Sequence, residues 1–460
     1  MPTRLGKAVA GIRIRGFKLF DELELGDLGM INVLVGRNNT GKTTIMEAVN
    51  AVLGEGGLED LLRFDSLEKP RMYNILNART RADEARVEIT TGEGEKLALA
   101  LRRPTDEEIL SALLELLADL LGYRGESATA RAWAKAEESL TLNRFAEVVR
   151  TRFDEAKLAG LLAQALTAGD LSRTTLPGVA LECDGKRAVL VNPSLVRRAV
   201  SELIHAVERD HNVERDHELT QYYTKRWKMI SLIDIVTSGA IGEVLRSMCA
   251  RGRSEHSSFY YDSAYYRFYD ISEIPGRART QLVALEIERE LKEMMVEEDL
   301  VRFNFDSVVL RGPRGEYEVP MGEMGSGFSA LAKLVAILTG LATTREKPGA
   351  GMPDVLLLEE PELHMHPGYI SRLVAFLTRL SMRSGIQLFI STHSPDLLQE
   401  LLGDQEHGGV LGEDERRYLR EQLRVVQLAR NFKGEPVARV FGSEEARVSM
   451  QGLLLDLRGP

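Results

Sequence analysis

The sequence predicts an α/β protein in which parallel strands alternate with crossover helices. An apolar strand at 31–35 runs directly into a glycine-bearing loop, and residues with helical spacing follow from position 43. The last third of the chain repeats this alternation, with apolar strands at 355–358 and 387–390. Strands that alternate with helices pair in parallel, because each crossover returns the chain to the same edge of the sheet.

Composition limits the classes of protein that need to be considered. The 460 residues carry 59 Lys plus Arg and 69 Asp plus Glu, a formal net charge of -10, and 44% are hydrophobic. This length suggests about three domains, or one large domain with insertions. The net negative charge disfavours coating nucleic acid with the whole surface, although a local basic groove is compatible with it.

Cysteine usage and hydropathy favour a cytoplasmic protein without a membrane partner. Only Cys183 and Cys249 are present, which excludes a disulfide framework and zinc sites built from paired cysteines. No apolar run approaches the roughly 18 residues of a membrane span. No charged-then-apolar signal peptide opens the chain.

The elements around and after the first loop follow from local patterns. Strands are expected at 11–17, 22–25, 86–90 and 97–101, the last two as a hairpin. Leucines at helical spacing predict helices from about 106 to 170, and more helix is expected from 194 to 249. Between these helices, a hairpin at 179–191 turns at Asp184-Gly185, a dipeptide suited to tight turns.

Two aromatic segments leave alternatives open. Residues 257–270 are rich in Tyr and Phe, which indicates a strand with its packing face or a surface that stacks nucleobases. A basic patch around Trp227, with Lys225, Arg226 and Lys228, would suit a DNA contact. Beyond them, a charged helix is expected at 279–296 and a strand-like segment at 301–311, with a turn at Gly312-Pro313.

The strongest chemical signal is a phosphate-binding loop between the strand at 31–35 and the helix that follows. It consists of Gly36, Arg37, Asn38, Asn39, Thr40, Gly41, Lys42 and Thr43, with Thr44 next in the chain. Backbone N–H groups and the positive end of the helix dipole would converge on the oxygens of a triphosphate. Lys42 would reach the β- and γ-phosphates, and the Thr43 hydroxyl would ligate Mg²⁺.

A second signal is the pair of carboxylates that ends the apolar strand at 355–358. Ligands of open α/β folds bind at the carboxyl ends of the strands. Adjacent strand residues point in different directions, so we expect Glu359 to face Mg²⁺ while Glu360 orients or deprotonates the attacking water. A metal position and a water-positioning group are the requirements of phosphoryl transfer to water.

Four segments together carry a resemblance to a known family. They are 36–43, Gly325-Ser326-Gly327, 358–362 and Ser391-Thr392-His393-Ser394. This set resembles an ABC-type ATPase head, of the branch shared by SMC-like and OLD-family (overcoming lysogeny defect) AAA proteins. The run Glu-Glu-Pro-Glu-x-His-x-His-Pro at 359–367 most resembles the OLD-like ATPases, and the resemblance covers about 11–60 and 300–441.

The resemblance implies a shared nucleotide site. Ser326 and Gly327 resemble the signature loop that binds the γ-phosphate held by the other subunit, with its helix starting near Ser329. His393 resembles the switch histidine, and Pro361 with Glu362 resembles a loop at the dimer interface. The implied state is a homodimer or higher oligomer whose heads enclose ATP and Mg²⁺.

Departures from the family narrow the expected role. No glutamine occurs between Lys42 and Gln164, so the usual glutamine loop is absent or replaced. OLD-family nucleases carry a C-terminal Toprim domain, whereas about 20 residues follow Phe441. Nuclease activity in such a system would therefore reside on a separate Toprim-type or other effector protein, with DNA as a further partner.

The predicted organisation is a P-loop NTPase of the ABC-type head class, with a mixed, mainly parallel sheet, interrupted by an insertion. Residues 1–102 and 256–441 form the head, 103–255 a mainly helical insertion with a hairpin, and 442–460 a tail. We expect an ATPase that acts as a nucleotide-driven switch in DNA processing or repair, or in phage defence. The alternatives are a transporter's cytoplasmic ATPase subunit and a standalone metal-dependent nuclease using Glu360, Glu362, His364 and His366.

Overall fold

The fold is taken from a computed structural model of the 460-residue chain. The structure describes residues 7–54, 61, 76, 82–120, 157–160, 162–163, 178–183, 185–210, 258–262, 281–294, 299–344, 354–403 and 410–452. The predicted helices between 121 and 177 fall mostly outside these ranges, as do those after 210. The basic patch around Trp227 and the aromatic residues after position 262 also lie outside the described residues.

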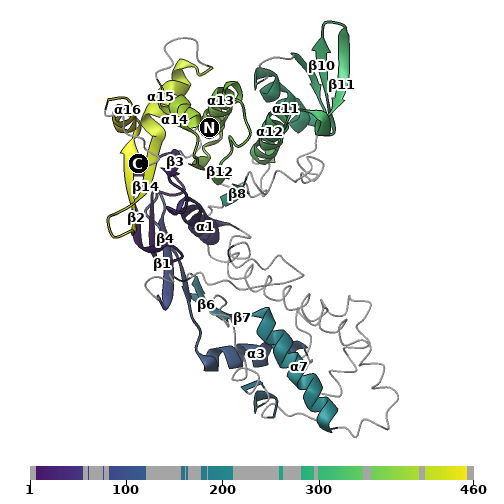
Figure 1. The fold of residues 1–460 in the computed structure, drawn as a ribbon, viewed down its shortest axis with the longest axis vertical. Coiled ribbons are helices and arrows are strands. Elements are labelled where there is room, and N and C mark those ends of the chain that lie inside the picture. The colour runs from purple at the N-terminus through teal and green to yellow at the C-terminus, as the bar shows by residue number, and fades with distance from the viewer. Residues whose placement is uncertain are drawn as a thin grey trace.

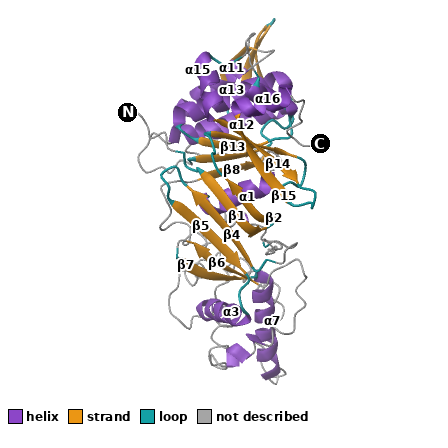
Figure 2. Ribbon diagram, turned by 90° about the vertical axis from the view of Figure 1, so that its left-hand side faces the viewer, coloured by secondary structure: helices purple, strands orange, loops and turns teal. Residues whose placement is uncertain are grey.

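A mixed sheet forms the centre of the molecule, in the order β15-β14-β3-β13-β12-β8. Its strands are β3 (Ile31–Gly36), β8 (Ser258–Asp262), β12 (Val355–Glu359), β13 (Gln387–Ser391), β14 (Leu423–Arg430) and β15 (Pro436–Gly442). All neighbours pair in parallel except β15, which is antiparallel to β14. Figure 2 shows this sheet between a layer of helices and a second sheet.

The central strands are apolar throughout because both faces of the sheet are covered. In β3, Ile31, Val33 and Val35 join the core on the helical side, whereas Leu34 joins the core on the opposite side. Strand β12 divides in the same way, with Leu356 and Leu358 on the first side and Leu357 on the second. The side-chain period of a strand therefore supplies two separate cores from one apolar run.

A second, antiparallel sheet lies across the first, in the order β2-β1-β4-β5-β6-β7. Its strands are β1 (Gly11–Phe17), β2 (Phe20–Leu25), β4 (Glu84–Thr90), β5 (Lys96–Arg102), β6 (Gly178–Cys183) and β7 (Lys186–Val191). Helix α1 (Lys42–Leu53) packs between the two sheets, and most of its side chains are buried. Figure 1 shows this helix directly below the central sheet, beside β4.

The hairpin expected within the insertion continues the antiparallel sheet. Strand β6 pairs with β5, for example at Leu101 and Leu181, and β7 completes the sheet. Two helices lie beyond it, α3 (Asp106–Leu120) and α7 (Pro193–Asp210), and form the lower end of the molecule in Figure 1. The domain boundaries at 102, 255 and 441 stay predictions.

Helices cover the other face of the central sheet. They are α11 (Gln281–Met294), α12 (Ser326–Thr344), α13 (Pro367–Ser384), α14 (Pro395–Leu402), α15 (Glu413–Gln422) and α16 (Ser443–Gly452). The helix α16 lies in the predicted tail, and its Ala446 is fully buried. No described helix combines the length and apolar character needed to cross a bilayer.

A small sheet, β11-β10-β9, stands beside α11 and α12. The predicted strand-like segment at 301–311 divides into β9 (Asp299–Phe303) and β10 (Ser307–Gly312) because the chain turns at 304–306. Strand β11 (Gly315–Pro320) follows, and the short 3₁₀-helix η4 (Met321–Glu323) leads into α12. These elements confirm the predicted α/β class, with a mixed, mainly parallel central sheet and a phosphate loop after β3.

A buried amide fastens the N-terminal segment to the central sheet. The Gln387 side chain is fully buried, and its Nε2 donates to the carbonyl oxygens of Val9 and Gly29, both at 2.7 Å. Its Oε1 accepts from the Val9 N–H at 2.7 Å. These bonds satisfy the buried N–H and carbonyl oxygen of Val9, and they give the Gly29 carbonyl oxygen a second donor beside the Asn32 Nδ2 at 2.8 Å.

Replacing Gln387 tests whether its amide holds the N-terminal segment on the central sheet. We expect Gln387→Met to lower the free energy of unfolding by about 2 to 5 kcal/mol, because the buried N–H and carbonyl oxygen of Val9 lose their partner. Urea denaturation followed by circular dichroism measures the change. The exposed Gln399→Met serves as the control; equal stability of the two variants would contradict this account.

Candidate functional site

The phosphate loop is shaped by two glycines in conformations that other residues avoid. Gly36 has φ 151°, and a Cβ there would approach the Leu428 carbonyl oxygen to 2.3 Å. Gly41 has φ 108°, and its Cβ would meet the buried ring of Phe20 at 2.3 Å. Only glycine fits such positions without displacing its neighbours. The sequence pattern therefore reflects steric limits at both ends of the loop.

The loop ends where α1 begins, and the helix start has the features of an anion site. Gly41 is the N-cap residue and provides no side-chain cap, so the first turn keeps its N–H groups for another acceptor. Arg37, Asn38 and Asn39 are exposed, whereas Thr40 and Thr44 are buried. The Thr40 hydroxyl donates to the Arg37 carbonyl oxygen at 2.8 Å and braces the loop.

Lys42 is the buried cation of the loop. Its Nζ donates to the carbonyl oxygens of Gly36 at 2.9 Å and of Arg37 at 3.1 Å, and the residue is only 7% exposed. Burial lowers the pKa of Lys42, and the negative charges of Glu360 and Glu359 oppose this shift. The ammonium group therefore faces the carboxylates at the end of β12 as well as its own loop.

Glu359 joins the phosphate loop to the end of β12. One of its oxygens, Oε1, accepts a hydrogen bond from the Thr43 hydroxyl, and Oε2 accepts one from the Tyr260 hydroxyl of β8. A carboxylate and a threonine hydroxyl are hard oxygen donors of the kind that Mg²⁺ prefers. Their direct contact fits the predicted metal position at Thr43 and Glu359, with phosphate oxygens and water as the remaining ligands.

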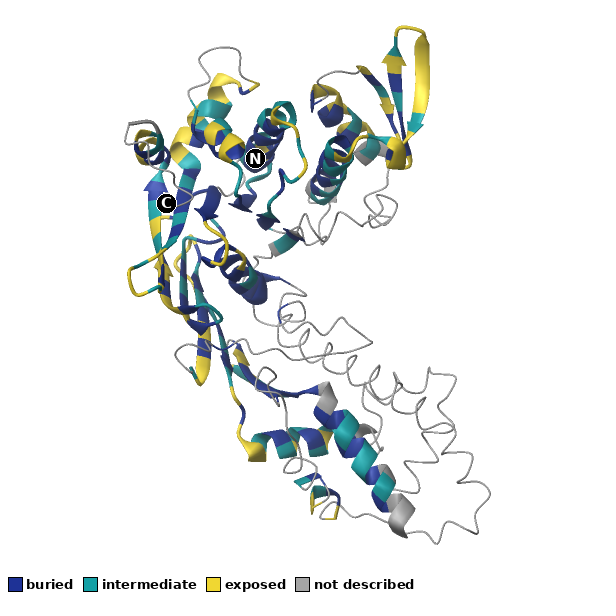
Figure 3. Cartoon of the chain, in the orientation of Figure 1, coloured by how far each residue is buried: buried dark blue, intermediate teal, exposed yellow. Residues whose placement is uncertain are grey.

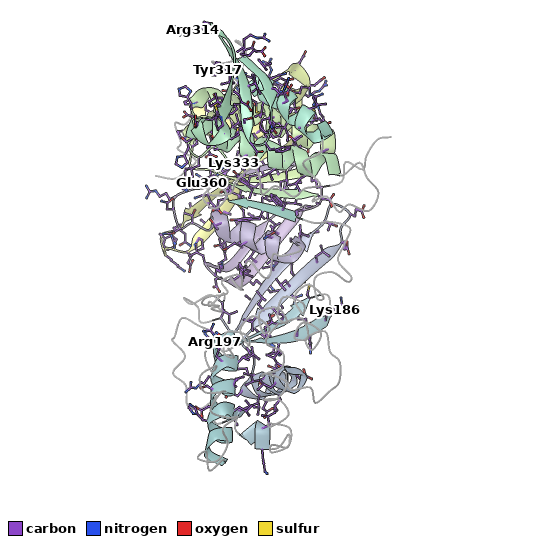
Figure 4. All side chains as sticks on the ribbon, turned by 90° about the vertical axis from the view of Figure 1, so that its right-hand side faces the viewer. Lys186, Arg197, Arg314, Tyr317, Lys333 and Glu360 are labelled. Atoms are coloured by element: carbon purple, nitrogen blue, oxygen red, sulfur yellow. The ribbon has the colours of Figure 1, made fainter. Side chains whose placement is uncertain are left out.

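Glu360, which is predicted to position the attacking water, lies next to His393. Its backbone is held at φ 46°, a rare conformation for a non-glycine residue, by an N–H bond to the Ser391 carbonyl oxygen at 3.0 Å. Its Oε1 lies 3.7 Å from the His393 Nε2, and both side chains are about one-third exposed. Figure 4 shows Glu360 at the level of the central sheet.

Glu362 is a buried acid that connects the loops after β12 and β13. Its Oε1 accepts a hydrogen bond from the Thr392 hydroxyl, which in turn accepts from the Ser394 N–H at 2.9 Å. The other oxygen, Oε2, is buried without a hydrogen-bond partner. Burial, together with the nearby charge of Glu360, raises the pKa of Glu362 to about 7, although the hydrogen bond from Thr392 opposes the shift.

The residues of the predicted signature lie on another part of the head. Ser326 is exposed and starts α12, so the helix begins one turn before the expected position near Ser329. A Cβ on Gly327 would approach the His364 carbonyl oxygen to 2.9 Å, which places the start of α12 against the loop after β12. Within the described residues, no hydrogen bond joins Ser326 to the phosphate loop of its own chain.

The two histidines after Glu362 have local structural features. The His366 Nδ1 accepts from the Gly368 N–H at 3.2 Å and caps α13. His364 has φ 70°, in the left-handed region. Across the described ranges, no group of three or more His, Cys, Asp and Glu side chains has the arrangement of a metal site.

Sequence reasoning missed two contacts with the site. Tyr260 was included in an aromatic segment but not connected with Glu359, which it reaches from the neighbouring parallel strand. Arg430, at the end of β14, donates from Nη2 to the Asn39 carbonyl oxygen of the phosphate loop at 2.7 Å. Only the pairing of distant strands reveals these contacts. Arg63 and Asp65, which lie where the missing glutamine loop was expected, are outside the described residues.

Two protein-family models match parts of the chain. Residues 12–145, which include the phosphate loop, match a model described as "AAA domain". Residues 204–399, which include the paired acids and His393, match one described as "AAA domain, putative AbiEii toxin, Type IV TA system". No curated protein matches the chain in sequence. Both ends of the head thus match AAA-domain models, and the chain is an ATPase of the P-loop class.

Solved structures of SMC heads share features of the fold at low identity. The SMC head domain from Thermotoga maritima is 12% identical, with a TM-score of 0.41, over 95% of this chain and 98% of that one. The Smc head with an extended coiled coil, bound to the C-terminal domain of ScpA and derived from Pyrococcus furiosus, is 14% identical. Its TM-score is 0.40, over 97% of this chain and all of that one.

The raised pKa of Glu362 predicts a pH-dependent stability. The folded protein binds the proton of the Glu362 carboxyl more tightly than the unfolded chain does. The stability that this proton contributes is therefore complete below pH 4.5 and is lost as the pH rises through about 7. We expect Glu362→Gln, which is neutral throughout, to gain stability over the wild type between pH 5 and 8. The gain is at most on the order of 3 kcal/mol.

Denaturant unfolding at several pH values measures this gain. The exposed Glu24→Gln is the matched control, since its carboxylate is solvated in both states. Parallel pH profiles for the wild type and Glu362→Gln would show that Glu362 is charged in the folded protein across this range.

Proposed function

We propose that the chain binds ATP with Mg²⁺ and hydrolyses it in a site closed by a second copy of the head. The observation that carries this proposal is the contact between the phosphate loop and the end of β12, made by Thr43 and Glu359. In this proposal the loop from Gly36 to Thr44 binds the phosphates. Mg²⁺, when bound by Thr43 and Glu359, neutralises charge on the β- and γ-phosphate oxygens.

The side chains around the terminal phosphate bind its oxygens and position the attacking water. Lys42 pairs with the phosphate oxygens through its ammonium group. Glu360 orients the attacking water and accepts its proton, and His393, whose Nε2 lies 3.7 Å from Glu360, hydrogen-bonds the γ-phosphate or that water. Glu362 is a positioning residue, because its bond to Thr392 holds the loop that bears His393.

A dimer is proposed because the signature residues are exposed and lie apart from their own phosphate loop. Ser326 and Gly327 begin α12, and the start of a helix is suited to bind phosphate through its N–H groups. A second head would bring its Ser326 to the γ-phosphate held by the first. ATP would then join two heads, and hydrolysis would release them, which makes the chain a nucleotide-driven switch.

The proposed biological setting is DNA processing or repair, or phage defence, with a separate effector protein. Support comes from the OLD-like run after β12 and from the AAA-domain match whose description names a toxin–antitoxin system.

Replacing Glu360 separates binding from hydrolysis. We expect Glu360→Gln to bind ATP as the wild type does and to hydrolyse it at least about a hundredfold more slowly, because the amide cannot accept the proton of water. The variant should accumulate as a dimer with trapped ATP. Phosphate release and size-exclusion chromatography with light scattering measure the two effects.

The control for this variant is Glu413→Gln, an exposed acid at the start of α15. It should hydrolyse ATP at the rate of the wild type. Unchanged turnover of Glu360→Gln would remove this residue from the catalytic role, whereas loss of ATP binding would show that its charge is needed to form the site.

Mixing two inactive variants tests whether sites form between subunits. Ser326→Arg blocks the contribution of one head, and Lys42→Ala disables the phosphate loop of the other. A heterodimer of the two contains one intact composite site, so random mixing should restore up to about a quarter of the wild-type rate. ATP hydrolysis measured against the ratio of the two proteins provides the readout.

The matched control carries both substitutions on one chain and is mixed with wild-type protein. In a heterodimer of this double variant with the wild type, neither composite site is intact, so the activity of the mixture should equal that of its wild-type homodimers alone. No recovery in the first mixture, with both variants folded and dimeric, would contradict the shared site.

A further inference from the structure

The turn between β14 and β15 is a short, internally bonded loop. The Asn431 N–H donates to the Glu435 carbonyl oxygen at 2.9 Å, and the Gly434 N–H donates to the Asn431 carbonyl oxygen at 2.8 Å. The Asn431 Oδ1 accepts from the N–H groups of Lys433 and Glu435, both at 2.9 Å. With Gly434 at φ 75°, the side chain of Asn431 fixes the course of the turn.

Arg430 fastens this turn to the phosphate loop. Its Nη1 donates to the Gly434 carbonyl oxygen at 2.7 Å, and its Nη2 donates to the Asn39 carbonyl oxygen, also at 2.7 Å. Strand pairing brings the two segments together, because Leu428 of β14 is the partner of Gly36 in β3. The turn therefore keeps a fixed position beside the loop that would hold the phosphates.

Phe432 projects from this turn into solvent. It is 95% exposed, more than any other large apolar side chain in the described part of the chain. Figure 3 shows the turn as an exposed segment at the edge of the central sheet. The Lys433 Nζ lies 5.9 Å from the centre of the Phe432 ring. Single exposed apolar residues are common on protein surfaces, so the position of Phe432 matters more than its exposure.

The order of the strands indicates where a bound nucleoside would lie. The γ-phosphate end of the site is marked by Glu359, Glu360 and His393, which follow β12 and β13. These strands lie on one side of β3, and β14 lies on the other. A triphosphate that runs along the phosphate loop from its γ end would therefore direct its nucleoside toward β14 and its turn.

We propose that Phe432 stacks on the base of the nucleotide bound at the phosphate loop, with Lys433 beside it. This inference rests on the proposed function and adds a nucleoside-binding surface to it. An aromatic ring stacks on any base, because every base has a π face. The ligand class is a nucleoside triphosphate, with no selection among the bases by Phe432 itself.

The test compares ATP with inorganic tripolyphosphate, which has phosphates but no base. Calorimetry with Mg²⁺ measures both affinities for the full chain and for Phe432→Ala. We expect the variant to bind ATP at least about tenfold more weakly, since stacking of one base contributes that much or more. It should bind tripolyphosphate within twofold of the wild type. Phe432→Trp should restore the affinity for ATP.

The exposed Val437→Ala, on β15 beyond the turn, is the control and should bind both ligands as the wild type does. Equal weakening of ATP and tripolyphosphate by Phe432→Ala would overturn the proposal and assign the turn to support of the phosphate loop. Unchanged binding of ATP would also overturn the proposal, and it would indicate that Phe432 contacts another macromolecule instead. If wild-type protein binds neither ligand, the proposed function fails, and this inference fails with it.

Discussion

The parallel pairing of β3, β13 and β12 is the constraint on which the site depends. Parallel strands end at the same edge of a sheet, so the segments that follow them must meet there. Leu34 pairs with Ser391, and Ser391 pairs with Glu359, which sets the three strand ends side by side. The phosphate loop, the paired acids and His393 are thus brought together although more than 300 residues separate Thr43 from Glu359.

The same edge of the central sheet carries several groups that lower the stability of the folded protein. Lys42 is buried, Glu360 has a positive φ, and Glu362 is a buried acid with one oxygen that lacks a partner. A fold selected for stability alone would replace such groups with apolar residues, because burying an ionisable group costs free energy. Their concentration at the ends of adjacent strands is typical of sites in which charge and geometry serve chemistry.

The sequence predicted the local parts of this site and not the contacts between its distant parts. The phosphate loop and the acids after β12 were predictable because each motif consists of consecutive residues, and the strand or helix beside it is recognisable from the same stretch of sequence. Tyr260 and Arg430 were not, since each reaches the site through the pairing of its strand, and pairing partners are not encoded locally. The hairpin of β6 and β7 was predicted from its turn, but its place beside β5 depends on the same long-range choice.

Charge also determines how the signature helix is attached to the site. Arg379 of α13 is 11% exposed and lies 3.2 Å from Glu293 and 3.5 Å from Glu290, both on α11, which packs on α12. The pair of Arg379 with Glu290 is buried on both sides and resists separation, because parting it leaves an uncompensated charge. At the other end, Gly327 lies so close to the His364 carbonyl oxygen that a side chain would not fit between them. The start of α12 is therefore held against the loop that contains Glu362, and a displacement of that loop by nucleotide would move the signature residues directly.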